Sequence, residues 1–286
     1  DVDVTAQYGQ GGTILLDPAT LTVVDKGDTP GIDEVSELFI ETQSVAGVHQ
    51  IYEAENLITV EYMSDGVILG GTGNITLRNE YDTGGIYFQR QDEGALVPVG
   101  PRTAIQTVGG GDIYMLAGSG GITTGDLSCV EGPKVKGQNV GGPGKILLFT
   151  NNGGNIDTGA MLVKSGNNEV ISAISSGNLT IHGGLTSEAQ EVANPVDKTI
   201  TANICLVAGD FVEVNGDIVL YAHGKDLNYA KLHIDAGSTV TIDGKIDATA
   251  NTSGPSTVGD AATAETLVKI HTKSTSPSAV YVADGI

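Results

Sequence analysis

Acidic side chains are the groups in this sequence whose number and spacing could support chemistry. The chain has 35 Asp and Glu residues against 14 Lys and Arg, and two close pairs are Asp210 with Asp217 and Asp243 with Asp247. Glycoside hydrolysis requires two carboxyl groups about 5–10 Å apart. These positions belong to a repeated segment in which Ser, Lys or Val takes the equivalent place, which is typical of a solvated outer face. The sequence therefore predicts no catalytic residues.

The arginines and aromatic residues give little support to an enzyme that acts on acidic polysaccharides. A lyase would need an Arg or Lys base near a metal-bound carboxylate, whereas the three arginines lie in one third of the chain without a recurring Asp cluster: Arg78, Arg90 and Arg102. The chain has no Trp for sugar stacking. Five tyrosines could partly substitute: Tyr52, Tyr62, Tyr81, Tyr87 and Tyr114. A polysaccharide lyase or hydrolase is therefore the alternative to a function without catalysis, and unsaturated products or new reducing ends would reveal it.

Motifs for metal ions and phosphate are incomplete. Gly70-Gly-Thr-Gly-Asn-Ile75 begins like a calcium nonapeptide, but Ile75 stands where a ligating Asp is required, and hard cations need several converging oxygens. Gly109-Gly-Gly-Asp112 lacks the Lys-Ser/Thr pair and the helix of a phosphate loop. The histidines lack zinc-binding spacing: His49, His182, His223, His233 and His271. We predict no metal ion and no cofactor.

Composition excludes two classes of partner. The formal net charge is −21, whereas nucleic acid and anionic membrane surfaces attract Lys and Arg clusters. No apolar run approaches the roughly 18 residues of a membrane span, so we expect no membrane insertion. Formal glycosylation sequons begin at Asn74, Asn178 and Asn251. The same Asn-x-Thr sequence also occurs where a Gly-Asn corner leads into a strand.

The elements that position these side chains are strands, because one stretch repeats. Residues 209–222 align with residues 237–250 at an offset of 28, and apolar and polar residues alternate on both sides of an Asn-Gly or Asp-Gly corner. A strand–turn–strand unit repeated at this interval indicates a solenoid. The alternation predicts that six apolar residues share one core: Val212, Val214, Ile218, Val240, Ile242 and Ile246.

Strand phrases recur along the chain at uneven intervals. The predicted inward residues Ile75, Ile113, Leu147, Leu179, Val212 and Val240 are separated by 38, 34, 32, 33 and 28 residues. Each interval corresponds either to one coil with an inserted loop or to two coils of minimal length. The Asn-Gly and Asp-Gly corners could also serve the hairpins of a β-sandwich, but the apolar alternation continues through both corners at the same step.

Several phrases resemble a known family. Gly12-Thr-Ile-Leu-Leu-Asp-Pro-Ala-Thr-Leu-Thr-Val23 is similar to the "ILLDP" strand phrase of filamentous-haemagglutinin-type bacterial adhesins, and the segments 54–62 and 73–77 resemble their "NITV…NITL" phrases. Those long secreted proteins have shafts that are right-handed parallel β-helices. The resemblance implies an all-β, right-handed parallel β-helix with a structural or adhesive role, secreted or at the cell surface. The family's Asn-Pro-Asn secretion motif does not occur, which implies shaft or passenger; a phage tail-spike segment is a further alternative.

We predict one continuous β-helix domain over 1–286, with loop insertions near 26–37, 186–196 and 250–262. The segment 186–194 has helix-forming composition and predicts a turn or two of helix before Pro195. We expect no amphipathic helix to cover either end, where residues 1–5 and 279–286 read as strands. Open strand edges then favour copies of the chain in a head-to-tail filament, or the rest of a longer rod, as partners; cell-surface glycans are a further candidate. Cys129 and Cys205 lie on coils too far apart to form a disulfide.

Overall fold

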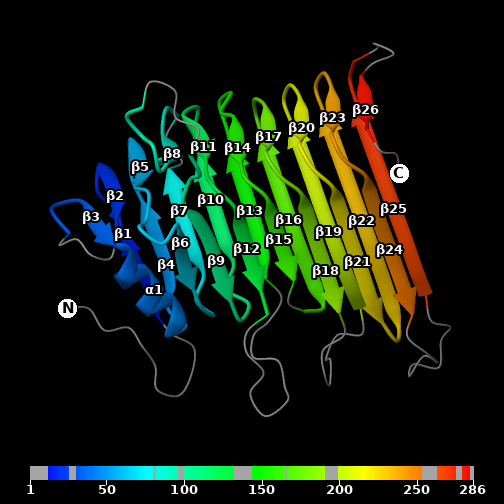
Figure 1. Ribbon diagram of the computed structural model, residues 1–286, viewed down its shortest axis with the longest axis horizontal. Coiled ribbons are helices and arrows are strands. Elements are labelled where there is room, and N and C mark those ends of the chain that lie inside the picture. Colours follow the sequence, from blue (N-terminus) through cyan, green and yellow to red (C-terminus); the bar gives the residue numbers. More distant parts are fainter. Residues whose placement is uncertain are drawn as a thin grey trace.

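The chain is a parallel β-helix, as the sequence predicts. The computed structural model describes residues 12–25, 30–79, 82–95, 100–131, 144–164, 166–190, 199–252, 263–274 and 279–283. The strands lie side by side along the long axis, with the N-terminal coils at one end and the C-terminal coils at the other (Figure 1). They form three sheets, here called A, B and C, and almost every coil contributes one strand to each.

Sheet A holds nine parallel strands in chain order. They are β1 (Thr13–Leu16), β4 (His49–Glu53), β7 (Ile75–Asn79), β10 (Ile113–Ala117), β13 (Lys145–Thr150), β16 (Asn168–Ser175), β19 (Thr199–Ala208), β22 (Leu227–Ala236) and β25 (Thr263–Thr272).

Sheet B lies along the upper edge in Figure 1 and holds ten short strands. They are β2 (Thr20–Val24), β3 (Glu34–Ser36), β5 (Leu57–Val60), β8 (Gly85–Phe88), β11 (Gly121–Thr123), β14 (Ile156–Thr158), β17 (Leu179–Ile181), β20 (Val212–Val214), β23 (Val240–Ile242) and β26 (Val280–Val282).

Sheet C holds seven strands and begins one coil later than the other two sheets. They are β6 (Val67–Gly70), β9 (Ala104–Val108), β12 (Leu127–Val130), β15 (Met161–Lys164), β18 (Leu185–Gln190), β21 (Ile218–Gly224) and β24 (Ile246–Thr252).

Strand register shows that the chain advances by one coil between equivalent residues, whereas Leu147 and Leu179 lie on different sheets and are not equivalent. Ile75 pairs with Ile113 in sheet A, and Val212 pairs with Val240 in sheet B. The uneven intervals therefore reflect corner length, because strand pairing stays in step while loops are added outside the stack. Leu147 was wrongly predicted to face inward. In β13 the core-facing residues are its neighbours Ile146 and Leu148, which are almost fully buried.

One apolar core runs the length of the rod. Ile, Val and Leu alternate with polar residues in nearly every strand and fill the space between the three sheets. The six residues predicted to share this core are all buried: Val212, Val214, Ile218, Val240, Ile242 and Ile246. The two cysteines are free. Cys129 faces the core from sheet C, whereas Cys205 lies on sheet A and is half-buried, so the wall of the helix separates them.

The prediction that no helix covers either end is wrong at the N-terminal end. Helix α1 (Glu37–Val45) follows β3, within and beyond the predicted 26–37 loop, and stands where the first coil would place a strand of sheet C. The Ser36 hydroxyl caps it by accepting a hydrogen bond from the backbone N–H of Phe39 at 3.3 Å. Gly47, at φ +79°, turns the chain away after its end.

Helix α1 covers the free edge of β6. The Glu41 carboxylate accepts a hydrogen bond from the backbone N–H of Leu69 at 2.8 Å, and the Ser44 hydroxyl accepts one from the N–H of Gly71 at 2.9 Å. Gly73 lies so close to this turn that a Cβ there would meet the carbonyl oxygen of Val48 at 2.1 Å. Side chains of the helix thus take the place of a neighbouring strand.

The helical prediction for 186–194 is wrong over its described part. Residues 186–190 belong to β18, which pairs in parallel with β15 and β21. Ser187 and Ala189 face the core and Glu188 forms an ion pair with Lys164 at 2.5 Å on the outside. Pairing with two neighbouring strands outweighs helix propensity here. Similarly, residues 250–252 of the predicted 250–262 loop are the end of β24.

Some predictions lie outside the described residues. These are the strand phrase at 1–5, the loop residues 26–29, the segment 191–196, the loop 253–262 and residues 284–286. Where the structure describes the chain, it contains no helix long and apolar enough to cross a membrane.

Candidate functional site

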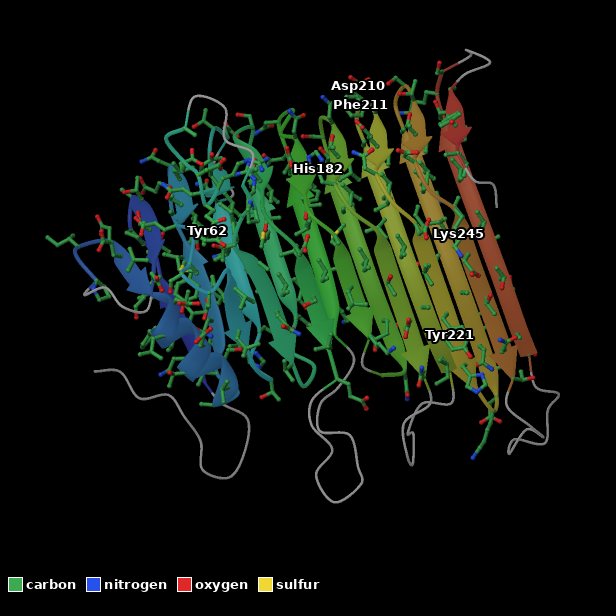
Figure 2. The ribbon with its side chains drawn as sticks, viewed as in Figure 1. Tyr62, His182, Asp210, Phe211, Tyr221 and Lys245 are labelled. Carbon is green, nitrogen blue, oxygen red and sulfur yellow. The ribbon has the colours of Figure 1, made fainter. Side chains whose placement is uncertain are left out.

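A groove of about 430 Å³ runs along the corner between sheets B and C. Its lining comes from five successive coils, beginning at Gly66 before β6 and ending at His182 after β17. Figure 2 labels His182 near the middle of the rod, on the last of these coils. Four charged residues share the groove with His182: Arg90, Arg102, Asp126 and Asp157.

The groove is hollowed because the corners that form its floor are short and contain glycine. Between β11 and β12 the corner is only Thr124-Gly125-Asp126, and between β14 and β15 it is Gly159-Ala160. A Cβ at Gly125 would lie 2.5 Å from the carbonyl oxygen of Thr103 on the preceding coil. Glycine is therefore required for the coils to pass this closely, and the same residue leaves no side chain to fill the space outside.

Arg90, Pro101 and Arg102, which lie between β8 and β9, form one side of the groove. Arg90 and Arg102 pair as an isolated antiparallel bridge. The guanidinium of Arg90 donates to the carbonyl oxygen of Gly100 at 2.8 Å, and that of Arg102 donates to the carbonyl oxygen of Phe88. Arg102 also stands over the Tyr87 ring, 5.2 Å from its centroid. These contacts orient both guanidinium groups from a fixed backbone.

Glu93 braces this segment from the solvent side. Its carboxylate accepts hydrogen bonds from the Arg90 backbone N–H at 3.0 Å and from the Tyr87 hydroxyl at 2.9 Å. The Arg90 N–H, then the Tyr87 hydroxyl, and the nearby guanidinium charges lower the pKa of Glu93. Neither Arg90 nor Arg102 forms an ion pair with a carboxylate among the described residues.

The acidic residues of the groove have partners of their own. Asp126 accepts a hydrogen bond from the Ala160 backbone N–H at 2.8 Å, which ties one corner to the next. Asp157 lies 3.1 Å from the His182 ring, with side chains that are 41% and 51% exposed. This arrangement offers hydrogen-bond acceptors on the floor and guanidinium donors on the wall.

A second hollow of about 270 Å³ lies over the outer face of sheet B and shares Asp157 with the groove. Thr123, Asp157 and Thr180 occupy one outward row, since strand register places them directly opposite one another on β11, β14 and β17. Asn155, Asn178 and Phe211 complete the lining. Figure 2 labels Phe211 at the corner before β20, near the upper edge of the rod. The two hollows therefore form one open surface with charged, hydroxyl, amide and aromatic groups.

The carboxylate pairs considered from the sequence lie on the outside of the rod. Asp210, Asp217, Asp243 and Asp247 are all exposed. Asp210 accepts from the Ser238 hydroxyl at 2.6 Å and Asp217 from the Lys245 backbone N–H at 3.0 Å, so both join successive coils. Their outer placement agrees with the sequence interpretation.

The aromatic and arginine candidates divide between core and surface. Tyr52 is fully buried and cannot stack on a sugar, and its burial raises the pKa of its hydroxyl. Arg78 forms an ion pair with Glu53 on sheet A. Tyr81 lies outside the described residues. Tyr87 lies beside the groove through its contact with Arg102, and the Tyr62 hydroxyl would lie 3.3 Å from a Cβ at Gly66, which lines the groove.

Sequence reasoning missed the groove because its residues are spread from Gly66 to His182. The available signal was the chain segment between Arg90 and Arg102, with Pro98 and Pro101, which marks an insertion between two strands. Which corners lie beside that insertion depends on the length of each coil.

A second polar cluster lies at the corner between sheets C and A. The Tyr114 hydroxyl donates to Asp112 at 2.7 Å, the Asp112 backbone N–H donates to the Asn74 side chain at 2.9 Å, and the Asn74 N–H donates to His49 at 3.1 Å. Burial raises the pKa of Asp112, although the Tyr114 hydroxyl and the Lys145 charge act in the opposite direction. The bonds run from coil to coil, so this cluster fastens the corner. It also engages Asn74, the first of the three sequons.

Comparison with known proteins leaves the assignment to the geometry. No protein-family profile, curated protein or solved structure matches the chain. Among the described residues no group of three or more His, Cys, Asp or Glu side chains is arranged to hold a metal ion.

Proposed function

We propose that the chain is a structural and adhesive section of a secreted or cell-surface fibre of the filamentous-haemagglutinin type. The observation that carries the proposal is the difference between the two ends of the stack. The ends differ in sheet C: helix α1 covers its first strand, β6, whereas its last strand, β24, has no further strand partner among the described residues. In sheets A and B the outermost strands, β1 and β3 at one end and β25 and β26 at the other, have a described strand partner on one side only. Such an edge pairs readily with another strand.

The last coil leaves apolar side chains open to solvent. Leu267 is 48% exposed and Tyr281 is 57% exposed. The core-facing positions Val268, Ile270 and Val282 pack against the core but stay partly open to solvent, unlike their fully buried counterparts in earlier coils. A further coil stacked on this edge would bury them and satisfy the free backbone groups.

We propose that this C-terminal edge takes up the next coil, from a longer rod or from another copy of the chain. The resemblance of the ILLDP and NITV phrases to bacterial adhesins supports a long shaft. The net charge of −21 keeps such a rod soluble and separate from its neighbours. We propose no reaction for the groove, since the two carboxylates that line it are already engaged.

Surface labelling tests the proposed location. Antibodies raised against the purified chain would be applied to intact and to permeabilised cells of the source organism. Labelling of intact cells is the expected result. Labelling only after permeabilisation would refute a secreted or surface fibre.

Sedimentation velocity tests the proposed edge contact between copies. We expect the parent chain to associate with rising concentration, and the double variant Val268→Lys/Ile270→Lys to sediment as a monomer because two charges then occupy the contact. The matched control Lys269→Ala changes the outward residue between them and should associate like the parent. A parent that stays monomeric at all concentrations would refute stacking between copies.

A further inference from the structure

We infer that the groove between sheets B and C binds linear oligosaccharides that carry carboxylate groups, with Arg90 and Arg102 as the anion-binding residues. The inference gives the adhesive part of the proposed function a ligand class and rests on that function in this respect alone. Binding and rod assembly use different surfaces, so each can fail without the other.

Two arginines that form no ion pair with a described carboxylate distinguish one wall of the groove, whose floor carries Asp126 and Asp157. The chain has a net charge of −21 and only three arginines. Arg78 is paired with Glu53, but no described carboxylate forms an ion pair with Arg90 or Arg102. Besides the Arg90 backbone N–H, both guanidinium charges lower the pKa of the nearby Glu93, but Glu93 forms no ion pair with either arginine. The arginine wall can therefore still accept an anionic ligand group.

The guanidinium groups are held in place and still have donors to offer. A guanidinium has five N–H donors, and one from each arginine is bound to the backbone, at Gly100 O and at Phe88 O. Stacking of Arg102 on Tyr87 fixes its plane further. A planar carboxylate can accept two parallel hydrogen bonds from one guanidinium, which a lysine ammonium cannot match.

The remainder of the surface favours a saccharide over an acidic peptide. The groove and the adjoining hollow follow successive coils and expose hydroxyl and amide groups, from Thr123, Thr180, Asn155 and Asn178. Sugar hydroxyls both donate and accept hydrogen bonds, and the flat face of Phe211 suits the C–H face of a sugar ring. A bound peptide would instead require a strand edge or apolar pockets, and sheet B is paired on both sides along this stretch.

Asp157 sets the orientation of the ligand in the groove. Its carboxylate lies where the groove meets the hollow and would repel a ligand carboxylate while accepting hydrogen bonds from sugar hydroxyls. The ligand's carboxylate therefore belongs at the arginine wall, and its hydroxyls belong over sheet B. Removal of the Asp157 charge should strengthen anion binding, whereas changes at the arginines should weaken it.

Isothermal titration of the chain with tetragalacturonate at low ionic strength tests the inference. We expect binding by the parent, and about a tenfold loss for Arg90→Lys and for Arg102→Lys, because each replaces a bidentate charge-assisted contact with a single one. Arg78→Lys makes the same chemical change away from the groove and should bind like the parent. Asp157→Asn should bind more tightly. Circular dichroism of each variant verifies that it folds.

Several results would overturn the inference. Absence of tetragalacturonate binding by the parent would do so, as would an equal loss in Arg78→Lys. Equal affinity for neutral cellotetraose would remove the role of the carboxylate, and equal affinity for a tetraglutamate peptide would remove the saccharide. Sedimentation of the same variants separates the two proposals, since we expect the groove variants to associate like the parent.

Discussion

Replacement of Val240 by Asp tests whether the alternating apolar residues of β23 face the core, as the fold requires. Val240 is fully buried in β23, with Val212 on one neighbouring strand and Val280 on the other. Burial of a valine side chain is worth about 2 kcal/mol, and an unpaired charge left in the interior costs about 3–5 kcal/mol more. The expected loss is therefore about 5 kcal/mol, which approaches the whole stability of an ordinary domain.

The loss should be confined to one end of the rod. Coils of a solenoid contact only their neighbours, so the C-terminal coils should open while the rest stays folded. Hydrogen exchange measured by mass spectrometry reports this directly. Peptides from β23 and β26 should exchange at least about a thousandfold faster than in the parent, and peptides from β7 and β10 should be unchanged.

The adjacent exposed residue provides a control of equal charge. Thr239→Asp adds the same carboxylate just before β23, on the solvent side, and should change stability by less than about 0.5 kcal/mol. Similar protection of β23 in the Val240→Asp and Thr239→Asp variants would show that Val240 does not face the core.

Three further outcomes are expected. A thiol reagent should label Cys205 in the native chain and Cys129 only after denaturation, because Cys129 is fully buried and burial raises the pKa of its thiol to about 12; two labelled thiols in the native state would contradict its placement. Asp112→Asn should raise the urea midpoint at pH 7 and leave it unchanged near pH 3, since a raised folded pKa costs stability only once the carboxyl ionises; an equal shift at both pH values would exclude this cause. Gly73→Ala should destabilise the chain by about 1–3 kcal/mol, measured by urea unfolding, because the new Cβ would meet the Val48 carbonyl; parent-like unfolding would show that the Gly73–Val48 contact relaxes freely.

The sequence by itself determined the class of fold and the inward face of most strands. Apolar and polar residues alternate around Gly216 and Gly244 with the period of a strand that has one buried face. This pattern is local and does not depend on the residues of the neighbouring coil. It therefore placed Val212 and Val240 in the core correctly. Leu147 lies in an unbroken apolar run, Ile146-Leu-Leu-Phe149, where alternation gives no phase, and there the inward residue was chosen wrongly.

Tertiary structure decided which local preferences were realised. Residues 186–190 have helical composition but form β18, because strands on both sides supply hydrogen bonds that an isolated helix of this length could not match. Residues 37–45 form a helix where a strand of sheet C would otherwise lie, and the free edge of β6 gives Glu41 and Ser44 their partners. Neither outcome can be read locally, since each depends on what the adjacent coil offers.

The groove depended on the tertiary structure altogether. Arg90, Asp126, Asp157 and His182 have no shared spacing in the sequence, because coil lengths differ and the register is restored by strand pairing, not by residue count. The sequence shows only that these residues are polar or charged; Asp157 lies within β14, and the other three lie between strands. Only the stacking of the coils, at about 4.8 Å per layer, decided that these four residues line one groove.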